Sequence, residues 1–349
     1  MSRSPHISVV MTVFNAGPFL REAVESILNQ TWRDFQFVIV DNKSTDGSLA
    51  ILRSYADPRV VLVENSENVG QTRALNIGLR HSQGKYIARM DANEAALPER
   101  LARQHGFLEK NPDIAVVGTW RLDIDRTGRS LRVFRGPTDP LSIRCCLAAS
   151  GELTNWCISH PTVMIRKEAL EKVGGYTEFP HIVHGFPQDY DLWAKMLMRD
   201  FQFANLPDVL LKYRIVEHSE SRQLPKSLLD YRLQISRNKI LFYLPKLNGD
   251  AVTRLVRLLE FLPQQTPEEG KDVLELFDVY FDAVMGENRS TREALAYRQR
   301  MKFYYLPVLS KTNGLLSLKK FFQLNCLNPR LMFDGRFYRK VVKAFLANG

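Results

Sequence analysis

The sequence predicts an α/β protein with a mostly parallel, doubly wound sheet, followed by a helical C-terminal region. In the first hundred residues, short apolar runs rich in β-branched residues alternate with stretches of helical periodicity, which is typical of βαβ units. Beyond Pro225 only helical periodicity remains. We therefore expect one α/β domain over residues 1–222 and a helical, basic region over residues 223–349.

Four apolar runs predict the first strands, and each run ends in polar residues. The runs are Ile7–Phe14, Phe35–Val40, Val60–Val63 and Tyr86–Met90. In a doubly wound sheet, ligands bind beyond the carboxyl ends of the strands. The polar residues at these ends are therefore candidate ligand-binding residues, namely Thr12 to Asn15, Asp41 to Lys43 and Asp91 to Glu94.

The rest of the chain shows strand and helix signals and then helix signals alone. Strands are expected at Ile114–Thr119, Ser130–Phe134, His160–Arg166 and Val209–Ile215, and helices at Lys167–Val173 and Asp189–Met198. The C-terminal region is expected to form helices at Leu228–Tyr243, Ala251–Leu262, Lys271–Met285 and Arg292–Tyr305. The element pattern thus places the sheet entirely in the first domain.

The charge of the chain is concentrated at its C-terminal end. The 349 residues carry a net charge of +10, and 45% of them are hydrophobic, which excludes wholesale disorder. From Arg289 to Gly349 there are thirteen Lys and Arg against two Asp and Glu, so the preceding 288 residues are nearly neutral. The chain also lacks a recognisable RNA-binding module, and we expect no nucleic-acid partner.

The basic end has an amphipathic pattern. Over Arg336–Leu346, apolar and basic residues separate onto two faces of a helix, and Lys319–Phe322 repeats the combination. This pattern is typical of an interfacial helix on an anionic membrane surface, although a helix packed on the enzyme with a solvated basic face has the same pattern. No apolar run is long enough to span a bilayer. We expect a cytoplasmic protein, peripheral on the inner face of the cell membrane.

Two acidic clusters are candidates for chemistry. In Asp91-Ala92-Asn93-Glu94, oxygen ligands two residues apart can hold a divalent cation, or can begin the following helix as a cap. Asp189 and Asp191 start a predicted helix, where one of them can act as a general base or both can cap the helix. Taken singly, neither cluster decides between these alternatives.

Two residues after the first strands are candidates for nucleoside binding. The ring of Phe14 can stack on a base or belong to the core. The carboxylate of Asp41 can accept from a base or ribose, or cap the next helix. Again, each residue alone leaves both interpretations open.

In their order and spacing, these motifs resemble those of family 2 glycosyltransferases over residues 5–222. The segments that carry the resemblance are Ile7–Asn15, Asp41–Ser48, Glu67–Gly78, Gly84–Glu94, Leu97–Leu101, His160–Arg166, Gly174–Tyr176, Gln188–Trp193 and Tyr213-Arg214. The resemblance implies a GT-A fold that binds a nucleotide-diphosphate sugar and transfers the sugar with inversion. It does not extend to the helical end of the chain.

The resemblance also implies a role for each matching residue. Thr12, Phe14 and Asp41 correspond to nucleoside-binding positions, with Asn15 beside them, and Arg73 lies near the base or diphosphate. Asp91 and Asn93 occupy the motif for the metal and the diphosphate, which implies Mn²⁺ or Mg²⁺ as cofactor. Asp189 matches the catalytic base of the family.

The sequence departs from the family pattern at its cation motif and at two other places. Asn93 stands where a carboxylate is expected and is a weaker ligand, so cation affinity falls unless Glu94 compensates. Val216 replaces a frequent histidine, and His218 is a further candidate ligand. Lys43 replaces a flexible glycine.

The predicted function is therefore inverting transfer from a UDP-linked or similar donor to a saccharide or lipid-linked acceptor in surface polysaccharide synthesis. The alternative is a catalytically weakened or non-catalytic relative that acts as a binding or scaffold module. Hydrolysis or transfer of any nucleotide sugar distinguishes the two.

Overall fold

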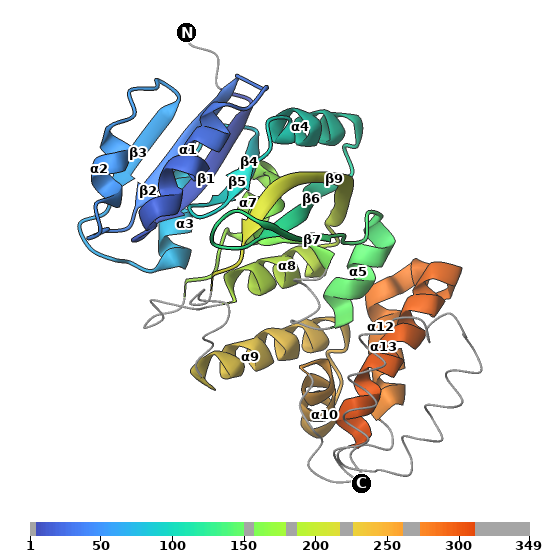
Figure 1. Cartoon of the computed structure of the whole chain (residues 1–349). Coiled ribbons are helices and arrows are strands. Elements are labelled where there is room, and N and C mark those ends of the chain that lie inside the picture. The colour runs from blue at the N-terminus through green and yellow to red at the C-terminus, as the bar shows by residue number, and fades with distance from the viewer. Residues whose placement is uncertain (1–4, 150–156, 179–186, 217–225, 261–272, 311–349) are drawn as a thin grey trace. The chain divides into compact units, whose positions relative to one another are not determined.

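The computed structural model describes residues 5–149, 157–178, 187–216, 226–260 and 273–310, with the backbone alone at 226–228, 300 and 303–310. The chain forms two compact units (Figure 1). The first comprises Met1–Ile143 and Thr154–Tyr231, and the second comprises Arg144–Leu153 and Arg232–Gly349. The division into domains at residues 1–222 and 223–349 stays a prediction.

The first unit is built on one sheet whose N-terminal half is parallel. In the described residues nine strands have the order β3-β2-β1-β4-β8-β6-β9-β5, with β7 paired to β6. Strands β1 (Ile7–Val13), β2 (Phe35–Asp41), β3 (Val60–Glu64) and β4 (Tyr86–Asp91) run parallel, as expected from the first hundred residues.

The second half of the sheet is mixed. Strand β8 (Met164–Arg166) runs antiparallel to β4 and to β6 (Ile114–Ile124), and β9 (Gln202–Arg214) runs parallel to β6. The short strands β7 (Ser130–Phe134) and β5 (Ala95–Ala96) are antiparallel to their neighbours. Most paired residues nevertheless lie in parallel ladders, so the predicted mostly parallel sheet is confirmed.

Alternate residues of the parallel strands face two separate cores, which is why the sheet is covered on both sides. One face carries Val9, Met11 and Ile39 against α1 (Leu20–Leu28), α2 (Ser48–Arg53) and α4 (Arg100–Lys110). The other face carries Val38 and Val40 against α3 (Gln71–His81). A Cβ at Gly78 would lie 2.6 Å from Val10 Cγ1, so this glycine allows α3 to approach the sheet.

Three segments differ from the expected elements. The strand expected at His160–Arg166 begins with a 3-10 turn, η2 (His160–Thr162), where Pro161 fixes the backbone and donates no hydrogen bond. Strand β6 continues five residues past its expected end, and β9 begins seven residues before its expected start, because the two strands pair along a long ladder. Helix α5 (Pro140–Ala149) was not expected.

The remaining helices of the first unit are close to the expected ones. Helix α7 (Lys167–Val173) has the expected bounds, and α8 (Gln188–Met198) begins one residue earlier than expected. The 3-10 turn η1 (Gly17–Phe19) precedes α1. Helix α1 connects β1 to β2, whereas α7 and α8 lie between β8 and β9, and α8 carries Asp189.

The second unit is helical, as expected for the C-terminal region. It contains α9 (Lys226–Tyr243) from Arg232 onward, the end of α5 from Arg144, and the helices α10 (Gly249–Leu259), α12 (Val273–Met285) and α13 (Arg292–Ser310), with the turn η4 (Gly286–Ser290) before α13. The buried Glu260 accepts hydrogen bonds from Arg232 Nη2 (2.7 Å) and Ser236 Oγ (2.5 Å). These bonds join α9 to the end of α10, and each of the helices α9, α10, α12 and α13 carries buried apolar residues.

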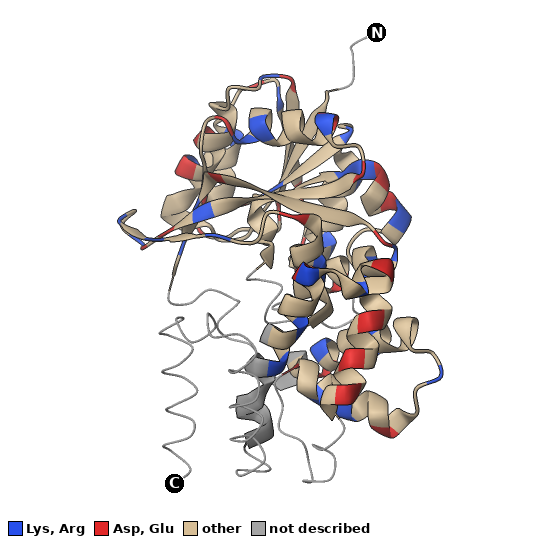
Figure 2. Cartoon of the chain, turned by 90° about the vertical axis from the view of Figure 1, so that its right-hand side faces the viewer, with Lys and Arg blue, Asp and Glu red and all other residues tan. Residues whose placement is uncertain are grey.

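Basic and acidic residues are interspersed over the described helices of this unit (Figure 2). The amphipathic segment Arg336–Leu346 and Lys319–Phe322 lie outside the described residues. Within the described chain, no helix is both long and apolar enough to cross a membrane.

Candidate functional site

The carboxyl ends of β1, β2 and β4 bring three predicted site residues together. Thr12 pairs in register with Asp91 on one side and with Val40 on the other, and Val13 pairs with Asp41. Adjacent strands of a sheet lie about 4.8 Å apart. Thr12, Asp41 and Asp91 therefore lie near one another at the carboxyl-terminal ends of three adjacent strands, as the spacing of the motifs predicts.

Asp41 is buried with part of its hydrogen-bonding capacity unused. The residue is only 1% exposed, and its Oδ2 accepts a hydrogen bond from the Ser44 N–H at 3.2 Å. Oδ1 has no partner among the described residues. A buried carboxylate oxygen without a partner carries a large desolvation cost, so this atom is suited to accept a hydrogen bond from a ligand.

The loops after β1 and β2 are locked to each other. Asn15 Oδ1 accepts from the Thr45 N–H at 2.7 Å, and the Asn15 N–H donates to Ser44 Oγ at 3.1 Å. Asn15 and Lys43 have φ values of 51° and 67°. Phe14, which lies between β1 and Asn15, is 43% exposed and therefore does not belong to the core.

Asp91 shares the end of β4 with a buried arginine that sequence reasoning missed. Arg89 Nη2 lies 2.5 Å from Asp91 Oδ1, and the side chain of Arg89 is 3% exposed. Two residues apart on a strand, both side chains point to the same face. The signal in the sequence was a single basic residue inside an otherwise apolar strand.

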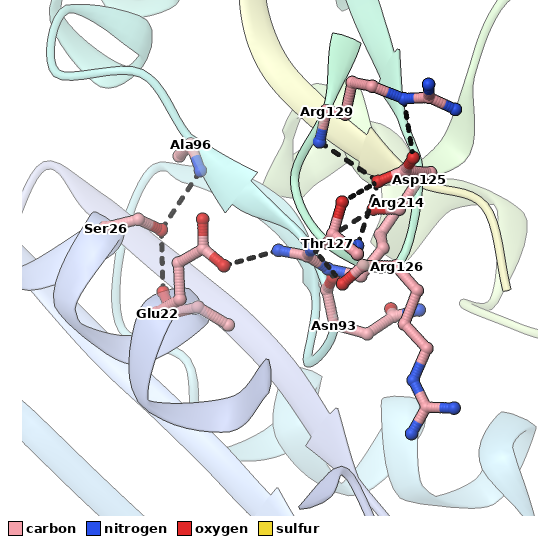
Figure 3. A network of polar contacts seen from close by, with 10 residues as sticks. Glu22, Ser26, Asn93, Ala96, Asp125, Arg126, Thr127, Arg129 and Arg214 are labelled. Carbon is pink, nitrogen blue, oxygen red and sulfur yellow. Dashed lines mark hydrogen bonds and ion pairs between the residues drawn. The ribbon is translucent and has the colours of Figure 1, made fainter. Parts of the chain in front are cut away.

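A second arginine holds the loop that follows β4 (Figure 3). Arg214, the last residue of β9, donates from Nε to the Asn93 carbonyl at 3.0 Å and from Nη1 to the carbonyls of Asp125 and Arg126 at 3.3 Å. Its Nη2 pairs with Glu22 on α1. The backbone of the predicted cation motif is thus tied to three other elements.

Glu94 lies in the same loop but is almost completely buried. It is 2% exposed, and its Oε2 has no partner among the described residues. Burial raises the pKa of Glu94 well above its ordinary value, and the nearby Asp91 raises it further. This shift disfavours the charged form of Glu94, and the charged form is the one that binds cations well.

The residues at the end of β4 fit a divalent cation that the substrate helps to hold. Mg²⁺ in such sites is bound by one or two carboxylates together with substrate phosphates. Asp91, the last residue of β4, would supply a carboxylate, and Asn93, two residues later, an amide oxygen. The described residues contain no cluster of three or more His, Cys, Asp or Glu that could hold a metal ion by itself, and His218 lies outside them.

Asp189 is the second residue of α8. Its Oδ1 accepts from the N–H of Tyr190 at 2.8 Å. Burial raises the pKa of Asp189, the charge of Asp91 raises it further, and Arg89 opposes the shift. Asp189, Asp91 and Arg89 are therefore close enough to interact electrostatically.

The first turns of α3 and α8 are in direct contact. Gln188 Nε2 donates to Gln71 Oε1 at 2.9 Å. Arg73, two residues further along α3, is exposed. The structure thus connects the helix of the predicted base to the helix of the predicted donor-binding arginine.

A buried histidine–tyrosine pair lies near these charged groups. His160 Nε2 and the Tyr176 hydroxyl are 2.8 Å apart. Burial lowers the pKa of His160 well below its ordinary value, with a further contribution from the Arg89 cation, so the imidazole is neutral. Sequence reasoning placed both residues in family-like segments without assigning them a role.

A doubly wound sheet with acidic side chains at the carboxyl ends of its parallel strands is typical of the α/β proteins that bind a ligand there. Residues 8–174 match the family model described as glycosyl transferase family 2. A glycosyltransferase of Methanocaldococcus jannaschii, MJ1057, is 34% identical over 215 residues, covering 60% of this chain and 71% of its own. The chain therefore belongs to family 2 and is a glycosyltransferase.

Other relatives and one solved structure agree. The O-antigen biosynthesis glycosyltransferase WbnJ of Escherichia coli is 33% identical over 232 residues, covering 64% of this chain and 84% of its own. The crystal structure of S. aureus TarS 1–349 in complex with UDP-GlcNAc superposes with a TM-score of 0.57 at 16% identity, over 85% of this chain and 91% of that chain. The expected GT-A fold is confirmed.

Proposed function

We propose that this glycosyltransferase moves a sugar, with inversion, from a nucleotide-diphosphate sugar to a saccharide or lipid-linked acceptor in the synthesis of a surface polysaccharide. The names of relatives support the pathway class: WbnJ acts in O-antigen biosynthesis, and AmsE of Erwinia amylovora in amylovoran biosynthesis. AmsE is 27% identical over 237 residues. The TarS complex with UDP-GlcNAc supports a UDP-linked donor.

The observation that carries the donor assignment is the unpartnered Oδ1 of the buried Asp41. An acceptor atom at the end of β2 suits the N–H of a base or the hydroxyl of a ribose. The exposed ring of Phe14 follows the neighbouring strand and suits stacking on the base. In this arrangement the nucleoside binds at Asp41 and Phe14, and its diphosphate extends toward Asp91.

The proposed chemistry is one in-line displacement. Asp189 takes the proton of the acceptor hydroxyl while the hydroxyl oxygen bonds to the anomeric carbon, and the bond from that carbon to the diphosphate breaks on the opposite face. The raised pKa of Asp189 brings its basicity closer to that of an effective general base. A divalent cation held by Asp91 and Asn93 would neutralise charge on the leaving diphosphate.

The experiment that tests the proposal starts from a panel of UDP-, GDP- and dTDP-sugars, with nucleotide release measured for each. Asp189→Asn in the full chain is expected to lower kcat by about 10²- to 10⁴-fold for the fastest donor. Its Kd for the free nucleotide should be unchanged, because the substitution removes a base and not a donor contact.

Asp208→Asn is the matched control, since Asp208 pairs with Arg103 at 2.7 Å on the surface and has no role in the proposed chemistry. It should retain full turnover. Full turnover in Asp189→Asn would exclude this residue as the base, and a chain that releases no nucleotide from any donor would support the non-catalytic alternative.

The cation is part of the same proposal and has its own test. Asn93→Asp restores a carboxylate beside Asp91, so we expect tighter binding of Mn²⁺ in the presence of UDP. Electron paramagnetic resonance of free Mn²⁺ measures this affinity directly. Equal affinity in the two proteins would show that the side chain at position 93 does not bind the ion.

We also propose that the basic end of the chain binds an anionic membrane surface. Replacing Lys319, Lys320, Arg339 and Lys340 with Gln in the full chain should release the protein from vesicles of anionic lipid. Each basic residue near such a surface contributes about 1 kcal/mol to the binding free energy. Sedimentation with vesicles measures the bound fraction. Undiminished binding would show that the charge serves another purpose.

A further inference from the structure

The turn after α7 is held in one conformation by glycines and helix-end hydrogen bonds. Gly174 and Gly175 have φ values of 77° and 66°. Their N–H groups donate to the carbonyls of Glu171 (3.0 Å) and Leu170 (2.9 Å), which closes the end of the helix. A Cβ at Gly175 would lie 3.0 Å from Asn76 Oδ1, so α3 approaches this turn closely.

Asn76 of α3 clamps the backbone of the turn from the other side. Its Nδ2 donates to the Tyr176 carbonyl at 2.9 Å, and its Oδ1 accepts from the Tyr176 N–H at 3.0 Å. The amide thus pairs with both polar groups of one residue, as a neighbouring strand would. Nδ2 also donates to Glu178 at 2.8 Å.

Residues 174–177 also make polar contacts with the N-terminal part of α8. Thr177 Oγ1 donates to Asp191 Oδ2 at 2.5 Å. Lys195 Nζ donates to the Gly175 carbonyl at 2.6 Å and to Thr177 Oγ1 at 2.9 Å, and it lies 3.4 Å from Asp191 Oδ2. Asp191 and Lys195 are four residues apart and therefore share one face of the helix.

Helix geometry gives the two aspartates of α8 different directions. At 3.6 residues per turn, consecutive residues are about 100° apart, so Asp189 and Asp191 point in directions that differ by about 160°. When Asp191 is fixed to the turn, the rotation of α8 about its axis is fixed as well. The direction of the Asp189 carboxyl group follows from that rotation.

We propose that Asp191 is a positioning residue that, through Thr177, aims Asp189 at the site. The contacts run from Asn76 on the donor-binding helix, through the turn at residues 174–177, to α8. The proposal rests on the proposed role of Asp189 as the base. It assigns separate roles to two acidic residues that the sequence could only group together.

The test compares two substitutions at Thr177 in the full chain. Thr177→Val keeps the shape and removes the hydroxyl, whereas Thr177→Ser keeps the hydroxyl. With the fastest donor of the panel, we expect Thr177→Val to lower kcat by about 10- to 100-fold, because a small misplacement of a catalytic group has effects of this size. The Kd for UDP should stay unchanged, and Thr177→Ser should restore kcat.

Hydrogen exchange of the α8 amides gives a readout that needs no substrate. Thr177→Val should accelerate exchange at residues 188–193, while Thr177→Ser should not. Thr31→Val is the control: Thr31 Oγ1 donates to the Pro98 carbonyl at 3.1 Å, and its loss should leave kcat and α8 exchange unchanged.

The outcomes separate this proposal from the proposed function. Equal kcat and equal α8 exchange in the Val and Ser variants would overturn the positioning role, even if Asp189→Asn is inactive. If Asp189→Asn keeps full turnover, the base assignment fails and the catalytic part of this proposal fails with it. Accelerated exchange in Thr177→Val would then show an anchor without a catalytic purpose.

Discussion

Buried polar groups have hydrogen-bond partners at the amino ends of the parallel strands, whereas some at the carboxyl ends have none among the described residues. At the amino ends, Ser8 Oγ donates to Gln36 Oε1 at 2.9 Å and accepts from the N–H groups of Gln83 (3.1 Å) and Gly84 (2.9 Å). At the carboxyl ends, Asp41 Oδ1 and Arg89 Nε are buried without a partner among the described residues. Both sets of groups have been removed from water.

The difference indicates what each end contributes. Polar groups whose partners all come from the protein stabilise the fold, and their loss is expected to affect stability alone. Groups that remain buried and unpartnered lower stability unless a ligand completes them. We therefore expect substitutions at the carboxyl ends to change activity and substitutions at the amino ends to change stability.

The largest expected effect is the response of turnover to pH, which acts at the carboxyl ends. Burial and Asp91 raise the pKa of Asp189 above the ordinary 3.8, so its basic form is lost earlier as the pH falls. Below that raised pKa, kcat/KM should fall by about tenfold per pH unit. A profile of nucleotide release measures the midpoint, and a midpoint at or below 3.8 would contradict the assignment.

Asp41→Asn tests the unpartnered oxygen itself. The substitution keeps an oxygen for the Ser44 N–H and replaces the unpartnered carboxylate oxygen with a donor. We expect the Kd for UDP to rise by about 10- to 100-fold, the value of a hydrogen bond to a charged group. The free energy of unfolding should change by less than about 1 kcal/mol. A large loss of stability with unchanged affinity would assign Asp41 to the fold.

The sequence predicted the parallel half of the sheet well because local patterns specify it. The bounds of β1 to β4 agree with the apolar runs to within one residue. Strands β1, β2 and β4 are buried on both faces and therefore read as mainly apolar segments, and the partly buried edge strand β3 is an apolar run as well. Strand β6 extends into Arg121 and Asp123, charged residues that pair with each other at 2.9 Å. Such residues end an apolar run in the sequence although they continue the strand.

The site was predictable only where a residue lies at the end of a strand. Thr12, Asp41 and Asp91 meet because parallel strands share an edge, which follows from the topology. The contact of Arg214 with Glu22 joins residues 192 positions apart, and no local pattern reveals it. Arg89 was missed although its partner Asp91 is only two residues away, because a single basic residue in an apolar run does not reveal that its side chain is buried.

Ser8→Ala provides the counterpart at the amino ends. It removes a hydroxyl that takes part in three hydrogen bonds and leaves the buried Gly84 N–H without an acceptor. We expect the free energy of unfolding to fall by about 1–3 kcal/mol, with the Kd for UDP and kcat unchanged. Denaturant titration and nucleotide binding measure both. A change in affinity equal to that of Asp41→Asn would remove the distinction between the two ends.

The smallest expected effect concerns backbone strain at the carboxyl ends. Lys43 has a φ of 67°, a left-handed conformation that costs a non-glycine residue about 1–2 kcal/mol, whereas glycine adopts it freely. Glycine also loses more entropy on folding, by roughly 0.5–1 kcal/mol. Lys43→Gly should therefore stabilise the protein by less than about 1 kcal/mol. Lys43→Ala, which keeps the strain and removes the same charge, should not stabilise it. If both variants are equally stable, the left-handed backbone of this loop carries no cost, and the unpartnered buried groups alone distinguish the carboxyl ends from the amino ends.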